Sequence, residues 1–153
     1  MTRLEVASTA PAFTLKNQDG VKISSKDLRG QRYVLYFYPA DDTPGCTKEA
    51  CQFSDGLEGF GRLGVRVFGV SPDPATAHAA FRAKYGLDFD LLSDPDKKVM
   101  TKYGAYGEKM MYGKKVIGVI RSTFIISPSG TIERAWYNVR ADGHAAKVLA
   151  ALD

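Results

Sequence analysis

The stretch Tyr33-Val-Leu-Tyr-Phe-Tyr-Pro-Ala-Asp-Asp-Thr-Pro-Gly-Cys-Thr-Lys-Glu-Ala-Cys51 decides the fold of this chain. Residues 33–38 form an aromatic and aliphatic run that ends at Pro39, which is typical of a central strand buried on both faces. The residues that follow predict a turn and then a helix, with Thr43 as the N-cap and a proline in the first helical position. Cys46 is therefore expected in the first turn of that helix.

The expected position of Cys46 favours a reactive thiol. A thiol at the start of a helix faces unpaired backbone N–H groups and the positive end of the helix dipole, and both favour the thiolate. Ionisation alone gives a small gain in rate, because the nucleophilicity of a thiolate falls with its basicity. A catalyst also needs donors that hold the electrophile and stabilise charge on its leaving atom. Thr43, the N–H groups of the helix start and an arginine from elsewhere in the chain are the expected donors.

The second cysteine, Cys51, lies five residues after Cys46. On an ideal helix this spacing places the two Cα atoms about 8.6 Å apart, whereas a disulfide requires about 4.4 to 6.8 Å. A bond between the two sulfurs would therefore require the first turns of the helix to unwind. This requirement favours a switch between a folded thiol form and a locally unfolded disulfide form over a permanent cross-link.

The stretch resembles the active-site segment of the peroxiredoxins. The signature of that family is a proline, a threonine four residues later and the peroxidatic cysteine three residues beyond, matched here by Pro39, Thr43 and Cys46. The resemblance is greatest to the bacterioferritin comigratory protein, or Q-type, branch. In that branch a resolving cysteine lies five residues further on, where Cys51 stands.

A second segment, Met111-Tyr-Gly-Lys-Lys-Val-Ile-Gly-Val-Ile-Arg-Ser-Thr-Phe124, is similar to the distal motif of the same family. It places Arg121 at the position of the active-site arginine. The resemblance extends from about Ala10 to the C-terminus. It implies a thioredoxin-like α/β fold, with a central mixed sheet flanked by helices and an N-terminal β-hairpin extension, as a single domain over residues 1–153.

The resemblance also implies an activity, a thiol-dependent peroxidase acting on hydrogen peroxide and organic hydroperoxides. Cys46 would be oxidised to a sulfenic acid while Arg121 and Thr43 hold the peroxide oxygens and Pro39 shapes the thiol pocket. Cys51 would then form an intramolecular disulfide, which thioredoxin or a similar dithiol protein would reduce. No metal, haem or flavin is implied.

The other predicted elements alternate between strand and helix. They are a hairpin over 12–24 around Asp19-Gly20 at one sheet edge, a helical turn over 24–30, a strand over 65–70, a helix from Asp73 to Tyr85 that stops at Gly86, a strand over 89–92 and a helix from Asp94 to Tyr103.

Beyond Tyr103 the sequence predicts a loop over 105–115 and then a hairpin of residues 116–127 and 131–139, with Arg121 in its first strand. The final helix is expected to have Asp142 as its candidate N-cap, with three apolar side chains toward the core, namely Ala146, Leu149 and Leu152.

Composition bounds the class of protein. The 153 residues carry a net charge of +4, but the basic residues are spread along the chain without a stripe or stacking motif, which argues against nucleic-acid binding. The sequence shows neither a leader-like apolar segment nor a run long enough to span a membrane. We expect a cytoplasmic monomer, in which two cysteines are reactive rather than structural.

Two other functions fit parts of the pattern. A thiol-disulfide oxidoreductase could use the same fold, but that chemistry normally uses Cys-x-x-Cys, and four residues separate Cys46 from Cys51. A non-enzymatic redox sensor could signal through the disulfide without turnover.

The remaining chemically notable residues have simpler interpretations. His78 and His144 lack zinc-like spacing with the cysteines and are assigned surface or capping roles. Four further side chains could border the active-site opening, although packing in the core or in a loop is the preferred interpretation, namely Met110, Met111, Tyr112 and Trp136.

Overall fold

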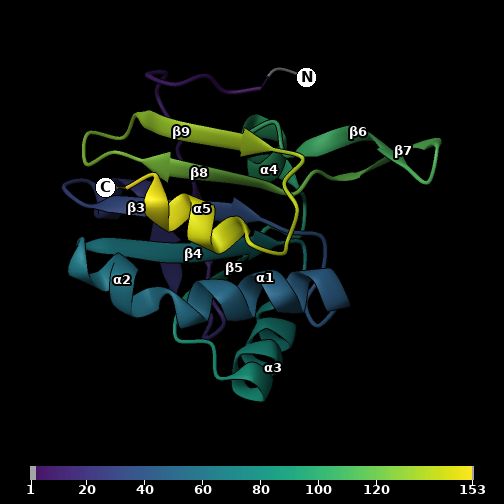
Figure 1. The fold of residues 1–153 in the computed structure, drawn as a ribbon, viewed down its shortest axis with the longest axis horizontal. Helices are drawn as coiled ribbons and strands as arrows, with labels where there is room; N and C mark the ends of the chain where they lie inside the picture. Colours follow the sequence, from purple (N-terminus) through teal and green to yellow (C-terminus); the bar gives the residue numbers. More distant parts are fainter. Residues whose placement is uncertain (1–2, 153) are drawn as a thin grey trace.

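The computed structural model describes residues 3–152. A seven-stranded mixed sheet forms its centre, and a separate two-stranded hairpin projects from the body (Figure 1). The elements in chain order are β1 (Thr14–Lys16), β2 (Lys22–Ser24), the 3-10 helix η1 (Ser25–Leu28), β3 (Arg32–Phe37), α1 (Pro44–Asp55), α2 (Leu57–Arg62), β4 (Val65–Ser71), α3 (Ala75–Tyr85), β5 (Asp90–Ser93), α4 (Lys98–Lys102), β6 (Tyr106–Met111), β7 (Lys114–Val119), β8 (Ser122–Ile126), β9 (Ile132–Tyr137) and α5 (His144–Ala150).

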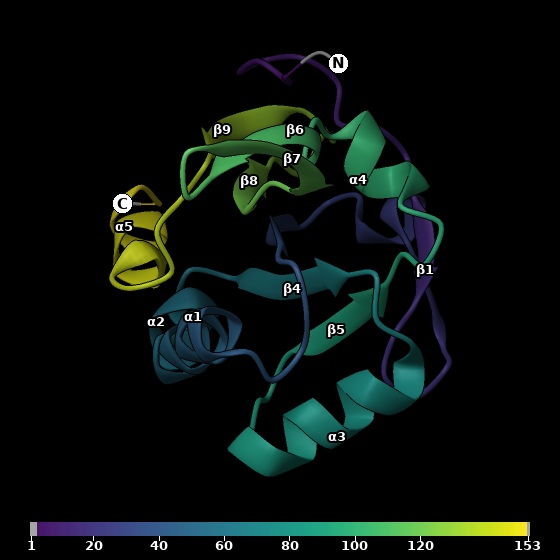
Figure 2. The ribbon, with the colours of Figure 1, turned by 90° about the vertical axis from the view of Figure 1, so that its right-hand side faces the viewer.

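The strand order in the main sheet is β2-β1-β5-β4-β3-β8-β9. β3 lies between β4, to which it is parallel, and β8, to which it is antiparallel. The N-terminal hairpin of β1 and β2 pairs with β5 and so covers one edge, as the sequence predicts. Helices α1, α2 and α5 lie together on one side of the strands, and α4 lies on the other (Figure 2).

Alternate side chains of β3 enter two separate cores. Val34 and Tyr36 pack in a cluster with residues of α1, α2, α3 and α5. Leu35 and Phe37 pack in a second cluster, which includes residues of α4. All four side chains are completely buried. The continuous apolar run of this strand therefore follows from the cover on both faces of the sheet.

The predicted loop over 105–115 is wrong, because residues 106–119 form the β6–β7 hairpin. Its two-residue turn is Tyr112-Gly113, and both residues have positive φ, as in a type I′ turn. The usual Asn-Gly signal is missing, and the mostly exposed strands lack apolar alternation. Arg121 consequently lies between β7 and β8 rather than inside one long strand.

Three exposed side chains at the hairpin end contradict the packing that we expected for them. The exposed fractions are 65% for Met110, 45% for Met111 and 99% for Tyr112. Trp136 is half-buried and packs edge-on against His144, as expected of a core-facing residue.

The surface or capping roles predicted for the two histidines are wrong, because both side chains are buried. His144 is the first residue of α5, and its Nε2 lies 2.8 Å from Thr123 Oγ1. Burial, followed by the charges of nearby cations, lowers the pKa of His144 to about 4, so its ring is neutral at pH 7. His78 lies within a polar network beneath the loop that follows β3.

Three helix starts differ from the predicted ones. α3 begins at Ala75 rather than at Asp73, and Pro74 occupies its N-cap position. α4 begins at Lys98 rather than at Asp94, because the Asp94 carboxylate accepts from the backbone N–H groups of Val99 and Met100 across an intervening turn. α5 begins one residue later than predicted, and Gly143 occupies its N-cap position.

The shifted start of α5 changes which side chains face the core. Ala145 and Val148 are buried, whereas Ala146 is exposed. Leu149 is half-buried, and Leu152 is buried as predicted. Along residues 3–152, the helices are all too short or too polar to cross a bilayer.

Replacing Gly69 by alanine should destabilise the fold, because the added Cβ would lie 2.9 Å from Tyr36 Cζ and 3.0 Å from Leu91 Cδ2. Overpacking of this kind lowers the free energy of unfolding by about 1–3 kcal/mol. Gly61→Ala is the matched control, since that site in α2 is open and alanine favours the helix by up to about 1 kcal/mol. Urea unfolding of both variants checks this, and equal midpoints would contradict it.

Candidate active site

The thiol of Cys46 lies in the first turn of α1, as predicted. Thr43 occupies the N-cap position with extended backbone angles (φ −94°, ψ 156°), and Pro44 is the first helical residue. Only 2% of Cys46 is exposed. The sulfur is therefore held at the end of the helix where backbone N–H groups lack intrahelical acceptors.

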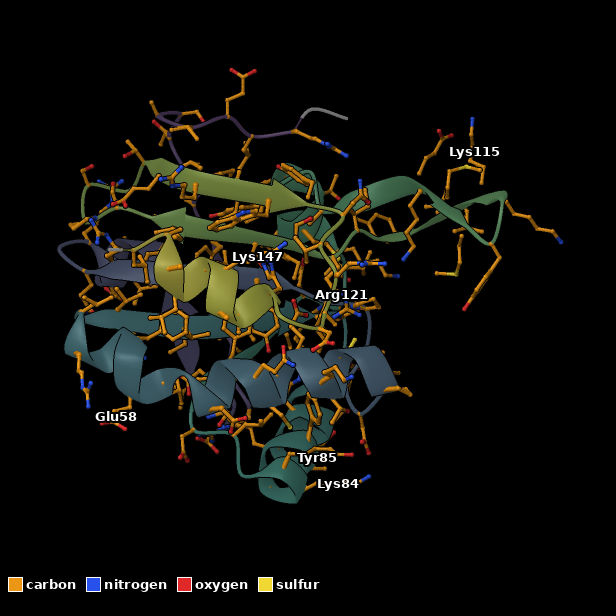
Figure 3. All side chains as sticks on the ribbon, viewed as in Figure 1. Glu58, Lys84, Tyr85, Lys115, Arg121 and Lys147 are labelled. Carbon is orange, nitrogen blue, oxygen red and sulfur yellow. The ribbon has the colours of Figure 1, made fainter. Side chains whose placement is uncertain are left out.

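Arg121 is the cation beside this sulfur. Its Nη2 donates to Cys46 Sγ over 3.3 Å. Its own carbonyl accepts from the N–H of Val139, which ties this residue to the segment after β9. The Arg121 side chain lies in the space between the sheet and α1 (Figure 3). Two segments separated by 75 residues thus meet at one sulfur, as the resemblance to the family's distal motif implied.

Gly45 permits this close approach. A Cβ on residue 45 would lie 3.3 Å from Arg121 Nη2. Such a contact is tighter than ordinary van der Waals contact, so a side chain at this position would press on the guanidinium. The glycine before Cys46 therefore leaves room for the arginine and does not serve a left-handed backbone angle.

Glu49 is a member of the site that the sequence prediction missed. It lies on α1 one turn after Cys46, and its side chain is completely buried. Arg121 Nη1 donates to Glu49 Oε1 over 2.6 Å, so one guanidinium contacts both the carboxylate and the sulfur. Burial raises the pKa of Glu49 to about 7, against the opposing effect of Arg121. The available signal was an acidic residue on the same helix face as Cys46.

Two polar atoms close to this pair have no hydrogen-bond partner among residues 3–152. They are Glu49 Oε2 and the hydroxyl of Tyr36. Burial, followed by the charges of Glu49 and Cys46, raises the pKa of Tyr36 well above its usual value, so the phenol stays neutral. The buried side of the site therefore contains one hydroxyl and one carboxylate oxygen without hydrogen-bond partners in the described part of the chain, and the carboxylate belongs to Glu49, whose pKa is raised.

Lys109 of β6 is a second cation near the site, also missed from the sequence. Its Nζ donates to the carbonyl of Val119 over 2.6 Å. Burial lowers the pKa of Lys109, the charge of Arg121 lowers it further, and Cys46 has the opposite effect. The β6–β7 hairpin thus contributes positive charge to the region around the sulfur.

Thr43 takes the predicted N-cap position, but its hydroxyl makes no capping hydrogen bond to the helix. Thr43 Oγ1 instead donates to the carbonyl of Ala40 over 3.0 Å. Pro39 lies two residues after the end of β3 and is half-buried. The loop between β3 and α1 therefore folds back on itself through the threonine side chain.

Cys51 and Cys46 are both free thiols in this structure. α1 is continuous from Pro44 to Asp55, so the two sulfurs belong to one intact helix whose spacing is too wide for a disulfide. Cys51 is half-buried, and burial followed by the charge of Asp55 raises the pKa of its thiol. The structure therefore represents the wound, reduced form.

A buried thiol at a helix start, held by an arginine on a mixed sheet with helices on both sides, defines a thiol-dependent redox enzyme. The model of the AhpC/TSA family matches residues 6–135. The chain belongs to this family, and it is a peroxiredoxin, an oxidoreductase with thiol peroxidase activity.

Relatives cover nearly the whole chain. A Mycobacterium tuberculosis protein that carries a peroxiredoxin name is 56% identical over 147 residues, which are 96% of this chain and 94% of the relative. Peroxiredoxin Bcp of Bacillus subtilis is 39% identical over 149 residues, with coverage of 97% and 95%. The predicted membership of the Bcp, or Q-type, peroxiredoxins is confirmed.

Solved structures agree with the fold. The bacterioferritin comigratory protein of Xanthomonas campestris, described in complex structures that address its alkyl peroxide reduction, superimposes with a TM-score of 0.89 at 39% identity and covers 97% of both chains. A mutant of PrxQ from Xylella fastidiosa gives a TM-score of 0.92 at 36% identity, covering 99% of this chain and 97% of that one. The predicted thioredoxin-like fold is confirmed.

The raised pKa of Glu49 predicts a pH dependence of stability. A buried acid whose pKa rises from 4.5 to about 7 on folding contributes stability that is complete below pH 4.5 and is lost as the pH rises through 7. In Glu49→Gln this loss should be absent, so the variant should gain about 3 kcal/mol relative to the unmodified protein between pH 4.5 and 8. Urea unfolding across this range measures the difference. Parallel stability curves for the two proteins would contradict the assignment.

Proposed function

We propose that Cys46 is the peroxidatic cysteine and that Cys51 resolves the oxidised sulfur. Arg121 and Thr43 hold the peroxide in a pocket that Pro39 helps to shape. The observation that carries this proposal is the contact of 3.3 Å between Arg121 Nη2 and Cys46 Sγ. The guanidinium is already oriented by Glu49 before any substrate binds. A fixed cation needs no reorganisation when charge develops on a leaving oxygen.

The first step breaks the O–O bond. The Cys46 thiolate attacks one peroxide oxygen and becomes a sulfenic acid, while the second oxygen leaves with the bonding electron pair and takes up a proton as water or alcohol. Arg121 is placed to donate to both oxygens, because its guanidinium carries five N–H donors in a fixed plane. The backbone N–H groups at the start of α1 supply further donors next to the sulfur.

The Thr43 hydroxyl complements these donors. It gives its proton to the carbonyl of Ala40, which leaves the oxygen lone pairs free to accept a hydrogen bond from the O–H of a peroxide. A peroxide can then be held by acceptor and donor groups at once, with its O–O bond in line with the sulfur.

The second step forms the disulfide. The sulfenic acid of Cys46 condenses with the Cys51 thiol, and water is released. The two residues lie on intact α1, so its first turns must unwind for the sulfurs to meet. Unwinding also exposes Cys51, which removes the burial that disfavours its thiolate.

A thiol reductant then returns both cysteines to the reduced state. Thioredoxin or a similar dithiol protein is the proposed donor, and both hydrogen peroxide and organic hydroperoxides are the proposed substrates. The alkyl peroxide activity described for the Xanthomonas campestris relative supports the organic class. We further propose that the protein acts as a single-domain cytoplasmic monomer without a metal or organic cofactor.

One equivalent of hydrogen peroxide should convert the reduced protein to a form with two fewer hydrogens and a linkage between Cys46 and Cys51. Mass spectrometry of the intact protein and of its peptides measures this. Cys51→Ser should accumulate sulfenic acid at Cys46, and Cys46→Ser should lose peroxidase turnover. An unchanged count of free thiols after oxidation would reject the assignment.

Arg121→Lys should slow the reaction of Cys46 with peroxide by about 10²-fold to 10³-fold. A lysine keeps the charge but cannot contact Glu49 and the sulfur together, and loss of one oriented donor costs about this much in rate. Stopped-flow measurement of the first oxidation step checks the effect. Arg134→Lys, at the exposed position of β9, is the control and should react at the rate of the unmodified protein.

A further inference from the structure

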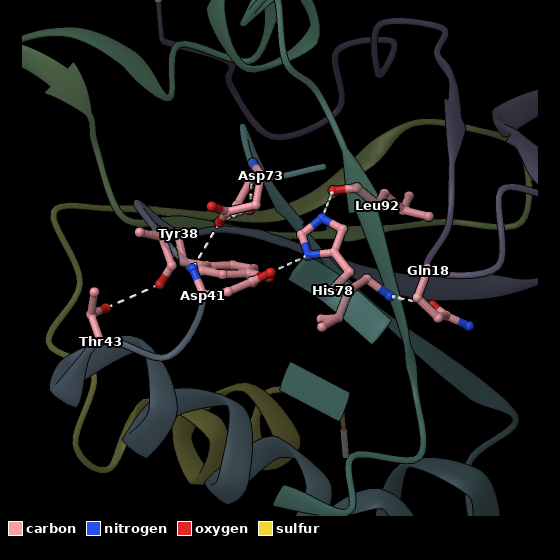
Figure 4. A network of polar contacts seen from close by, with 10 residues as sticks. Gln18, Tyr38, Asp41, Thr43, Asp73, His78 and Leu92 are labelled. Carbon is pink, nitrogen blue, oxygen red and sulfur yellow. Dashed lines mark hydrogen bonds and ion pairs between the residues drawn. The ribbon is translucent and has the colours of Figure 1, made fainter. Parts of the chain in front are cut away.

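A buried polar network lies beneath the loop that carries Thr43 and Cys46, and its centre is Asp41 (Figure 4). The backbone N–H of Asp41 donates to Asp73 Oδ2 over 2.7 Å. Its carboxylate accepts from the Tyr38 hydroxyl over 2.5 Å and lies 2.6 Å from His78 Nδ1. The backbone and the side chain of one loop residue are therefore both fixed.

The hydrogen-bond partners of His78 determine where its protons lie. His78 Nε2 is 3.0 Å from the carbonyl oxygen of Leu92, which can only accept, so Nε2 carries a hydrogen. Nδ1 is 2.6 Å from Asp41 Oδ2. A second proton must lie between these two atoms, on the ring or on the carboxyl group. With side-chain exposures of 0% and 6%, the two groups form one buried hydrogen-bonded unit.

Asp73 connects the loop to the end of β4. Its Oδ2 accepts from the Asp41 N–H and from the buried hydroxyl of Ser71, the last residue of that strand. His78 belongs to α3 and Tyr38 directly follows β3. Rigid elements therefore hold Asp41 from three directions, while the neighbouring Asp42 makes only exposed contacts with Lys84 and Tyr85.

The fixed N–H of Asp41 determines the direction of a carbonyl that Thr43 uses. The peptide unit between Ala40 and Asp41 is planar and trans, so its N–H and C=O point in opposite directions. The N–H is bound to Asp73, and the C=O accepts from the Thr43 hydroxyl. Rotation of this one peptide would redirect the Thr43 proton and the lone pairs proposed to face the substrate.

We propose that Asp41, held by His78 and Asp73, is a positioning residue that fixes the peptide between Ala40 and Asp41 and so orients the Thr43 hydroxyl beside Cys46. This inference rests on the proposed roles of Cys46 and Thr43. It assigns to the buried network an effect on the reaction with peroxide that is separate from its contribution to stability.

Two rates separate positioning from a general effect on the thiol. The reaction of Cys46 with hydrogen peroxide requires the oriented hydroxyl, whereas alkylation of the same thiol by iodoacetamide does not. Asp41→Ala should slow the peroxide reaction by about 10²-fold, the size expected for a displacement of about 1 Å. The same variant should change the alkylation rate by less than about 2-fold, because alkylation does not depend on the position of the Thr43 hydroxyl. Both rates are measured in Cys51→Ser, so that one thiol oxidation is followed.

Asp41→Asn is the conservative rescue. Its amide oxygen accepts from Tyr38, and its NH₂ donates to Nδ1 of a neutral His78 ring whose Nε2–H still bonds Leu92. This variant should keep a peroxide rate within about 3-fold of the parent, because the positions of the donors and acceptors are retained. Lys84→Ala is the control. It removes the exposed ion pair between Lys84 of α3 and Asp42 of the same loop, and it should leave both rates unchanged.

Asp73→Ala is a second variant that tests the same effect if Asp41→Ala does not fold. Asp73 is only half-buried, and its loss frees the Asp41 N–H directly. It should show the same selective loss of the peroxide rate. Parallel losses of both rates, or an unchanged peroxide rate in folded Asp73→Ala, would overturn the inference. Failure of the proposed function would give a different result, because Cys46→Ser would then still reduce peroxide.

Discussion

The guanidinium of Arg121, bound on one side by the buried carboxylate of Glu49 and on the other by the sulfur of Cys46, is the constraint on which the site depends. A buried carboxylate without a cation would be costly, and so would a buried guanidinium without an anion. The pair is therefore kept together whether or not substrate is present. The thiol of Cys46 is placed against a cation that the fold has already oriented.

The surrounding fold serves this arrangement from two directions. β3 is buried on both faces and ends at the loop that begins α1, so the position of Cys46 is tied to the centre of the sheet. Arg121 comes from the short connection between the projecting hairpin and β8, which pairs with the same central strand. Unwinding of the first turns of α1 would separate the sulfur from its cation, and formation of the disulfide requires the same unwinding.

Local signals made the strand over 33–38, the helix start and the place of Cys46 predictable, because an apolar run, a proline and an N-cap residue act within a few positions. The role of Arg121 came only from resemblance, since no local pattern marks an arginine that meets a residue 75 positions away. Glu49 and His78 were missed or misassigned because polar residues are usually exposed, and only tertiary contacts bury them. The β6–β7 hairpin lacked alternation, since most of both its faces is open to solvent.

Hydrogen exchange in α1, compared between the reduced protein and its disulfide form, tests the central claim most directly. The account predicts that the amides of residues 46–51 lose protection on oxidation while those of β3 and β4 keep theirs, since the sulfur can leave Arg121 only if the first turns unwind. Equal protection of α1 in both forms, with the disulfide between Cys46 and Cys51 present, would contradict it.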